Sequence, residues 1–545
     1  MPGRHANTAM RAPTPPEIYN WRVYLTAVVA SMGALLFGYD LAFIGTTITR
    51  DAFKKDFGLE DASEAANNAF DANIVSLLQA GCFFGSLFAG PLSDKVGRKW
   101  SIMISGMVFD IGSLMQTLAY GIKDVVYVGR VVGGLGVGAC SMLVPMYIAE
   151  MAPPTIRGRL VGLYEIFVQI GTCVGFWVNY GIAEHGPYGT ASWMTPFGLQ
   201  LIPGGVLIIG MLFMSESPRY LARTQGRESA EAGLSALRNL EKDHPYLIEE
   251  LGHVMDQIEQ EQIFAVGKGL KATVNMVCRK GNWNRLVIGN VMMIFMQTAG
   301  SNAINYFSPK IFKSIGLGGG STALYATGIY GIIRLVAVLI AMYFVVDKFG
   351  RTRMLMSGSA VMAVGLWFVG AYVKVANPEE SDNIGPAGYV AIAMLYIYAV
   401  GFCFSYAGIP WIYCSEIFPM NLRSIGVGSC TATHWLLNFV IARSVPYMIT
   451  DIGYGTYFVF ASFITVGIVW IYFFVPEVCL ILILLSISSS RADCSKTKGL
   501  SLEDMDILFG SPQATSDVEL GVDSEKRKQE IDSTHVEISG ASTTD

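Results

Sequence analysis

Twelve apolar runs, each about 20 residues long, follow one another along this chain and constrain its fold more than any other feature. A helix of that length crosses the roughly 30 Å hydrocarbon core of a bilayer. Hydrophobic residues make up 52% of the 545 positions and charged residues 15%, which excludes a water-soluble multidomain enzyme. We therefore predict an all-α membrane protein. The runs lie near 23–46, 72–92, 101–120, 125–147, 160–182, 197–214, 286–312, 322–346, 354–374, 388–412, 425–449 and 454–475.

Three short polar phrases occur twice, once in each half of the chain, and their two copies are separated by similar distances. This agreement predicts a single duplication, so the twelve spans form two bundles of six helices. The phrases are Asp94-Lys95-Val96-Gly97-Arg98-Lys99 and Asp347-Lys348-Phe349-Gly350-Arg351-Thr352, then Glu150 with Arg157 and Glu416 with Arg423, then Glu216 and Glu477.

A set of Lys and Arg residues in short loops falls on one side of the predicted membrane: Lys95, Arg98, Lys99, Arg157, Arg159, Lys348, Arg351, Arg353 and Arg423. The positive-inside rule makes that side cytoplasmic, and an even number of spans places both termini there. The predicted divisions are a cytoplasmic tail (1–22), a six-helix bundle (23–214), a cytoplasmic loop with short helices (215–284), a second six-helix bundle (285–477), an atypical insertion (478–496) and a largely disordered cytoplasmic tail (497–545).

The repeated charges are candidates for a gate at the cytoplasmic side. Each phrase puts a carboxylate, a glycine and a guanidinium at a turn between helices, within reach of a second carboxylate. The alternative is that these charges only cap helices and enforce topology. The gating candidates are Asp94, Arg98, Glu150, Arg157, Asp347, Arg351, Glu416 and Arg423.

Two charges lie well inside predicted spans, Asp40 in the first and Arg130 in the fourth. Their depths are similar, so they can pair inside the bundle. Ionisable residues within a membrane are expensive to bury and are functional candidates by default. A carboxylate that alternates between an Arg and a proton would couple transport to protons. The alternative is a permanent structural ion pair.

Further polar residues within the spans suggest a cavity for a hydroxylated ligand, although each of them could also hold helices together by hydrogen bonds. No nucleophile with a positioned base and no metal-ligand spacing stands out, and no basic surface suits nucleic acid, so we expect neither an enzyme nor a cofactor. The inventory is Glu165, Gln169, Gln297, Asn302, Asn305, Arg334, His434, Asn438 and Arg443.

These phrases, in this order from Tyr19 to Glu477, resemble the sugar porter branch of the major facilitator superfamily. The segments 13–24 and 38–47 look like those of fungal quinate permeases and their relatives. The resemblance implies the major facilitator fold and transport by alternating access. It also implies that Asp40 and Arg130 form a proton-linked pair, and that a monosaccharide-sized site is lined by Gln297, Asn302, Trp411 and Asn438.

Departures from the sugar porter pattern bear on the substrate. Those proteins usually carry Gln where this chain has Glu165 and Met296, and Asn where it has His434. Together with Arg334 and Arg443, these changes add ionic groups that a neutral hexose would not require. They favour a carboxylated polyol such as quinate or a uronic acid. The alternative is that Glu165 pairs with an Arg as a structural bridge in an ordinary sugar site.

We therefore expect a multi-pass protein of the plasma membrane that takes up a hexose, quinate or uronic acid with protons. Two alternatives stay open. One is a facilitated-diffusion uniporter, and the other is a nutrient sensor with a transporter fold. The family ending Pro-Glu-Thr-Lys-Gly is split between Pro476-Glu477 and Thr497-Lys498-Gly499. The intervening segment reads either as a translated intron or as a longer last helix.

Overall fold

The computed structural model describes residues 14–265, 277–278, 280–317, 320–345, 350–378, 385–418 and 422–475. The predicted insertion at 478–496, the tail at 497–545 and Asp347 lie outside these residues. The same is true of the side chains of Glu416 and Arg423.

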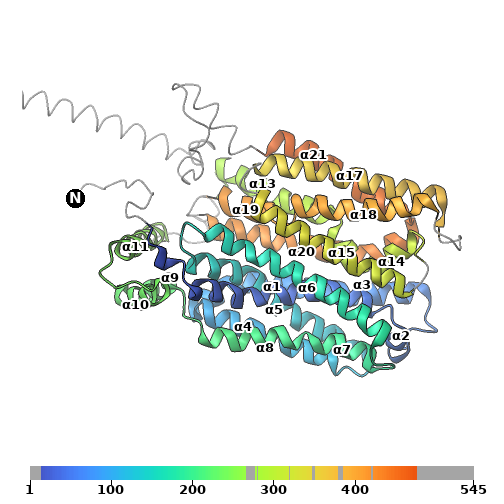
Figure 1. Ribbon diagram of the computed structural model, residues 1–545, viewed down its shortest axis with the longest axis horizontal. Coiled ribbons are helices and arrows are strands. Elements are labelled where there is room, and N and C mark those ends of the chain that lie inside the picture. The colour runs from blue at the N-terminus through green and yellow to red at the C-terminus, as the bar shows by residue number, and fades with distance from the viewer. Residues whose placement is uncertain are drawn as a thin grey trace, which may run out of the picture.

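The long helices form two groups that lie side by side, with the first half of the chain in one group and the second half in the other (Figure 1). The first half contains α1 (Trp21–Thr47), α3 (Glu64–Val96), α4 (Arg98–Thr117), α5 (Lys123–Met151), α6 (Arg157–His185), α7 (Ala191–Leu199) and α8 (Leu201–Phe213). The second half contains α13 (Lys280–Thr298), α14 (Ser301–Ser314), α15 (Gly320–Ile340), α17 (Arg351–Ala376), α18 (Pro386–Phe404), α19 (Ile409–Ile417), α20 (Arg423–Ile452) and α21 (Gly455–Phe474).

Short elements complete the described chain. A 3₁₀ turn, η1 (Pro16–Ile18), precedes α1, and α2 (Asp51–Asp56) follows it. A π-helical turn, η2 (Ala341–Val345), extends α15. Three loop helices, α9 (Pro218–Thr224), α10 (Arg227–Arg238) and α11 (Pro245–Ala265), lie at one end of the molecule, and α2 lies at the other (Figure 1).

Ten helical segments of the described chain are long and apolar enough to cross a membrane. The other two predicted runs also form helices. The run at 101–120 is α4, in which Asp110 and Gln116 lower the mean hydropathy. The run at 286–312 is divided between α13 and α14, each too short or too polar to qualify alone. The twelve predicted runs therefore all correspond to helical segments in the described chain.

Two of the predicted runs contain a break with non-helical backbone. The backbone between α13 and α14 turns at Gly300, whose φ of +88° is a left-handed conformation that favours glycine. The run at 388–412 likewise divides into α18 and α19. Hydrophobicity alone does not reveal such breaks, because the interrupting residues are themselves small or apolar. Discontinuous helices of this kind often border binding sites in transporters.

The two groups meet where α1 packs on α14, α3 on α20 and α6 on α15. At the end of the molecule that carries α2, polar side chains from α3 reach the second group. Lys310 Nζ lies 2.5 Å from Asp71 Oδ2, and Asn68 Nδ2 donates to Thr450 Oγ1 at 2.8 Å. Arg443 donates to Asn73 Oδ1. We call these six residues the inter-bundle latch.

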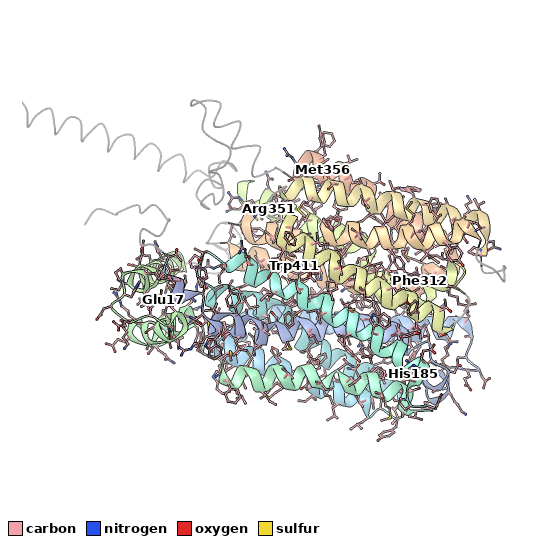
Figure 2. All side chains as sticks on the ribbon, in the orientation of Figure 1. Glu17, His185, Phe312, Arg351, Met356 and Trp411 are labelled. Carbon is pink, nitrogen blue, oxygen red and sulfur yellow. The ribbon has the colours of Figure 1, made fainter. Side chains whose placement is uncertain are left out.

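The loop helices are anchored to the first group. Arg238 of α10 pairs with Glu250 of α11 through two contacts of 2.6 and 3.0 Å. It also donates to the carbonyl oxygen of Met151 at the end of α5, at 2.7 Å. This guanidinium is buried, and its contacts hold α10 and α11 against α5. Figure 2 labels Glu17 and Arg351 toward this end of the molecule, and His185 and Phe312 toward the opposite end.

Candidate functional site

Asp40 and Arg130 form a closed ion pair between α1 and α5. Arg130 donates from Nη1 to Asp40 Oδ1 at 2.5 Å and from Nη2 to Oδ2 at 3.1 Å. Its Nε donates to the carbonyl oxygen of Ile74 on α3, at 2.8 Å. Both side chains are 0% exposed. Each carboxylate oxygen has a donor, so the pair satisfies the hydrogen-bonding demand of two buried charges.

Arg334 on α15 lies in a different setting, because its hydrogen-bond partners are neutral. Its Nε donates to Gln169 Oε1 at 3.1 Å, across the boundary between the two groups. The guanidinium carbon lies 5.1 Å from the centre of the Phe402 ring and 5.7 Å from the centre of the Tyr330 ring. Nη1 donates to Ser301 Oγ and Asn305 Oδ1, both at 2.8 Å. Arg334 is only 3% exposed.

Glu165 reaches Arg334 through one intervening residue. Gln169, one turn further along α6, donates from Nε2 to Glu165 Oε1 at 2.8 Å and accepts from Arg334 with its own oxygen. The chain of contacts Glu165, Gln169, Arg334 therefore joins α6 of the first group to α15 of the second. Glu165 is partly exposed, whereas Gln169 and Arg334 are buried.

A second polar cluster lies within the second half, at the break between α13 and α14. Asn302 donates to Gln297 Oε1 at 2.9 Å, and the Gln297 amide nitrogen lies 2.9 and 3.1 Å from the two ring nitrogens of His434 on α20. The ring of Trp411 on α19 packs 4.9 Å from that of His434. Figure 2 shows Trp411 at the boundary between the two groups.

The hydroxyl of Tyr306 on α14 joins three helices. Gln79 of α3 donates to it at 2.6 Å, and Asn438 of α20 lies 3.2 Å away through its amide nitrogen and 3.3 Å away through its amide oxygen. All three side chains are buried. The predicted substrate-binding residues thus fall into this contact, the Gln297 cluster or the Arg334 cluster.

The first copy of the gating phrase forms a charged cluster near the loop helices. Arg98 lies 3.2 Å from Glu150 and 3.5 Å from Asp94, and Arg223 of α9 donates to Asp94 at 3.0 Å. Glu216 accepts from the backbone nitrogens of Arg98 and Lys99, at 2.9 and 3.1 Å. Glu150 also accepts from the hydroxyl of Ser217.

Arg157 begins α6 with an exposed side chain and takes no part in the hydrogen bonds and ion pairs of this cluster within the described chain. In the second copy the described chain includes Arg351, which is partly exposed at the start of α17. Its predicted partners Asp347 and Glu416, and the further gating residue Arg423, fall outside the described side chains, so the gating role of this copy stays a prediction.

Arg443 does not join the Arg334 cluster, because its guanidinium is engaged by Asn73 in the inter-bundle latch. The latch itself was missed from the sequence. Lys310 offered a signal, since a lysine at the end of an apolar run requires a partner, but nothing local pointed to Asp71. The sequence indicated Glu216 as part of a repeated phrase, but it did not indicate the contacts of Glu216 with the Arg98 backbone.

Each group contains six of the predicted runs, and the two groups enclose polar clusters whose contacts cross from one group to the other. This arrangement defines a membrane transporter. Within the described residues, no group of three or more His, Cys, Asp or Glu side chains is arranged to hold a metal ion. The family model for sugar (and other) transporters matches residues 26–483. The chain belongs to this family.

Curated relatives cover most of the chain. It is 43% identical over 504 residues to a probable quinate permease of Aspergillus fumigatus, a match that covers 92% of this chain and 89% of the relative. It is 42% identical over 503 residues to the quinate permease of Emericella nidulans, covering 91% and 90%. The predicted resemblance to sugar porters of the fungal quinate permease sub-branch is confirmed. The prediction that the chain is a transport protein and not an enzyme is also confirmed.

Solved structures agree on the fold. The xylose transporter XylE from E. coli, in a partially occluded inward-open conformation, matches with a TM-score of 0.71 and 27% identity over 84% of this chain and 99% of that one. The proton:xylose symporter XylE bound to 6-bromo-6-deoxy-D-glucose matches with a TM-score of 0.71 and 26% identity, over 90% and 99%. The predicted major facilitator fold is confirmed.

Proposed function

We propose that this chain takes up a carboxylated polyol, such as quinate or a uronic acid, together with a proton by alternating access. The observation that carries the proposal is the setting of Arg334. A guanidinium keeps its positive charge in a protein, and burial makes an uncompensated charge costly. The direct hydrogen-bond partners of Arg334 are neutral oxygens and Glu165 lies one residue further away, so a substrate carboxylate would be the anion in direct contact with the guanidinium.

The geometry of an arginine also favours this ligand. Its planar fork binds a carboxylate through two parallel hydrogen bonds, which a sugar hydroxyl cannot match. The amides and ring of the Gln297 cluster would then take the substrate's hydroxyl groups, with Trp411 against its apolar face. The names of the curated relatives, which are quinate permeases, support the same class of substrate.

We further propose that Asp40 and Arg130 link transport to protons. Protonation of Asp40 would release Arg130 from its two contacts and change the packing of α1 on α5. The proton:xylose symporter among the structural neighbours supports a symport mechanism. In the same proposal the Arg98 cluster is a cytoplasmic gate, both termini are cytoplasmic and the membrane is the plasma membrane.

Uptake of radiolabelled quinate in a transporter-deficient host tests the substrate. We expect competition by galacturonate and unlabelled quinate, and weak competition by glucose and by the methyl ester of quinate. Arg334→Gln should raise KM for quinate roughly ten- to hundredfold, because a charge-assisted hydrogen bond contributes about 1.5–3 kcal/mol. Arg159→Gln, at an exposed position of α6, is the matched control. Competition by neutral hexoses alone would overturn the proposed substrate class.

Proton coupling has its own measurement. Adding substrate to a weakly buffered suspension of cells should make the medium more alkaline, and Asp40→Asn should abolish this signal. Substrate uptake without alkalinisation in the unmodified protein would instead identify a uniporter.

A further inference from the structure

We propose that Glu165 is a second proton-binding group, which takes up a proton when the substrate's carboxylate binds at Arg334. The inference rests on the proposed acid substrate and deepens it. It places a proton at the substrate site itself, in addition to the proton proposed at Asp40.

The contacts give Glu165 a direct link to the anion site. Gln169 donates its amide N–H to Glu165 and accepts from Arg334 with its amide oxygen. The carboxylate of Glu165 therefore orients the amide and helps to hold the guanidinium. Within the described chain, Arg334 donates to Gln169, Ser301, Asn305 and Tyr330, none of which is acidic, so its link to a carboxylate runs through Gln169.

Charge balance supplies the next step. With the site empty, the positive charge of Arg334 and the negative charge of Glu165 compensate each other at one remove. A substrate carboxylate adds a second negative charge in the same buried region, where like charges repel strongly because screening is weak. A proton on Glu165 removes that excess. Bound substrate, Arg334 and protonated Glu165 then sum to zero.

Exposure separates Glu165 from Asp40. The Asp40 carboxylate is 0% exposed and both of its oxygens accept from Arg130. Glu165 is partly exposed, and within the described chain a single donor, Gln169, contacts one of its oxygens. A proton can therefore reach Glu165 without first breaking a buried ion pair.

The other titratable groups that face Glu165 do not provide an alternative proton site near neutral pH. They are Arg334 on α15, the thiol of Cys403 on α18 and the phenol of Tyr164 on α6 itself. Arg stays protonated in proteins, and thiols and phenols lose their protons only at alkaline pH in ordinary surroundings. On α1, which packs on α6, Asp40 is engaged by Arg130.

Equilibrium binding of radiolabelled quinate to the purified full chain tests this inference between about pH 5.5 and pH 8, where quinate itself remains an anion. In the unmodified protein the Kd should rise with pH, approaching tenfold per pH unit, which is the limit for one linked proton. Glu165→Gln should bind quinate with an affinity that no longer depends on pH. Glu184→Gln, at an exposed position of the same helix, should behave like the unmodified protein.

A second measurement covers the case in which Glu165→Gln fails to fold. Binding of quinate to the unmodified protein in weak buffer should take up about one proton per ligand. The methyl ester of quinate, which carries no charge, should take up none. Quinate binding without proton uptake would overturn the inference.

The outcomes distinguish the inference from the proposed function. Equal affinity for quinate and its methyl ester at every pH would show that the acid substrate itself is wrong. Preference for quinate with an unchanged pH dependence in Glu165→Gln would overturn only the role of Glu165. Loss of the pH dependence in Asp40→Asn, together with its retention in Glu165→Gln, would assign the proton to Asp40.

Discussion

The role of each buried charged residue in this protein depends on which groups compensate its charge. Arg130 has a carboxylate on two of its nitrogens, whereas Arg334 has amides, hydroxyls and aromatic rings. The same side-chain type therefore forms a closed ion pair at one position and is held by neutral groups at the other, where we propose the anion site. The difference follows from partners that lie far away in the sequence, Asp40 for Arg130 and Gln169 for Arg334.

A double-mutant cycle on the closed pair follows from this contrast. Asp40→Asn or Arg130→Met alone leaves one buried charge unpaired, which we expect to destabilise the protein by about 3–5 kcal/mol. The double variant leaves no unpaired charge, so its loss of stability should be clearly smaller than the sum of the two single losses. Thermal unfolding in detergent measures all four proteins. Additive losses would contradict the buried pairing.

Elements in this fold are shaped by where helices stop as well as by where they are apolar. The break at Gly300 turns the chain between α13 and α14, so that Gln297 and Asn302 approach each other. In a continuous helix, the regular helical repeat would set the positions of these two residues relative to each other instead. The break in the seventh run is thus part of how the Gln297 cluster is built.

Gly300→Ala tests that break. A left-handed backbone costs a residue with a Cβ about 1–2 kcal/mol, and the added atom would lie 2.8 Å from the ring of Phe460. We therefore expect a lower melting temperature and weaker quinate uptake. Gly162→Ala is the control, because the added Cβ there meets nothing within 4 Å and the residue lies within α6. A Gly300→Ala protein as stable as the control variant would exclude a strained turn.

In the whole molecule, the two groups of helices are joined to each other at the end that carries α2. The inter-bundle latch connects α3 with α14 and α20 there. At the other end, the contacts of the Arg98 cluster within the described chain stay within the first half and its loop helices. With the loop side taken as cytoplasmic, this arrangement is closed toward the outside. The xylose transporter XylE, which has a similar fold, has been solved in a partially occluded inward-open conformation.

Breaking the Lys310 and Asp71 pair should shift the balance toward the outward-open state. The pair is partly exposed, at 31% and 13%, so we expect an effect of about 1 kcal/mol, or roughly a fivefold change in population. Spin labels at the exposed positions Glu60 and Asp451, with Cys278→Ser, would report a larger share of long distances in Lys310→Met.

The exchanged pair Asp71→Lys with Lys310→Asp should restore the original distribution, and Lys55→Met, at an exposed position of α2, is the charge-matched control. An unchanged distance distribution in Lys310→Met would show that the pair does not contribute to closure.

The sequence by itself determined the spans and the family and predicted a duplication, since hydrophobic runs and repeated phrases are local features that need no folded contacts. It also identified the polar residues that belong inside the membrane, because each is costly there. Only the tertiary structure decided which of them meet. Arg334 was brought to Gln169 across the boundary between the groups, while Arg443 was carried to Asn73. The breaks within runs and the pairing of Lys310 with Asp71 likewise depended on packing between distant segments. The physical reason is that a side chain's type is set locally, whereas its partner is chosen by the fold.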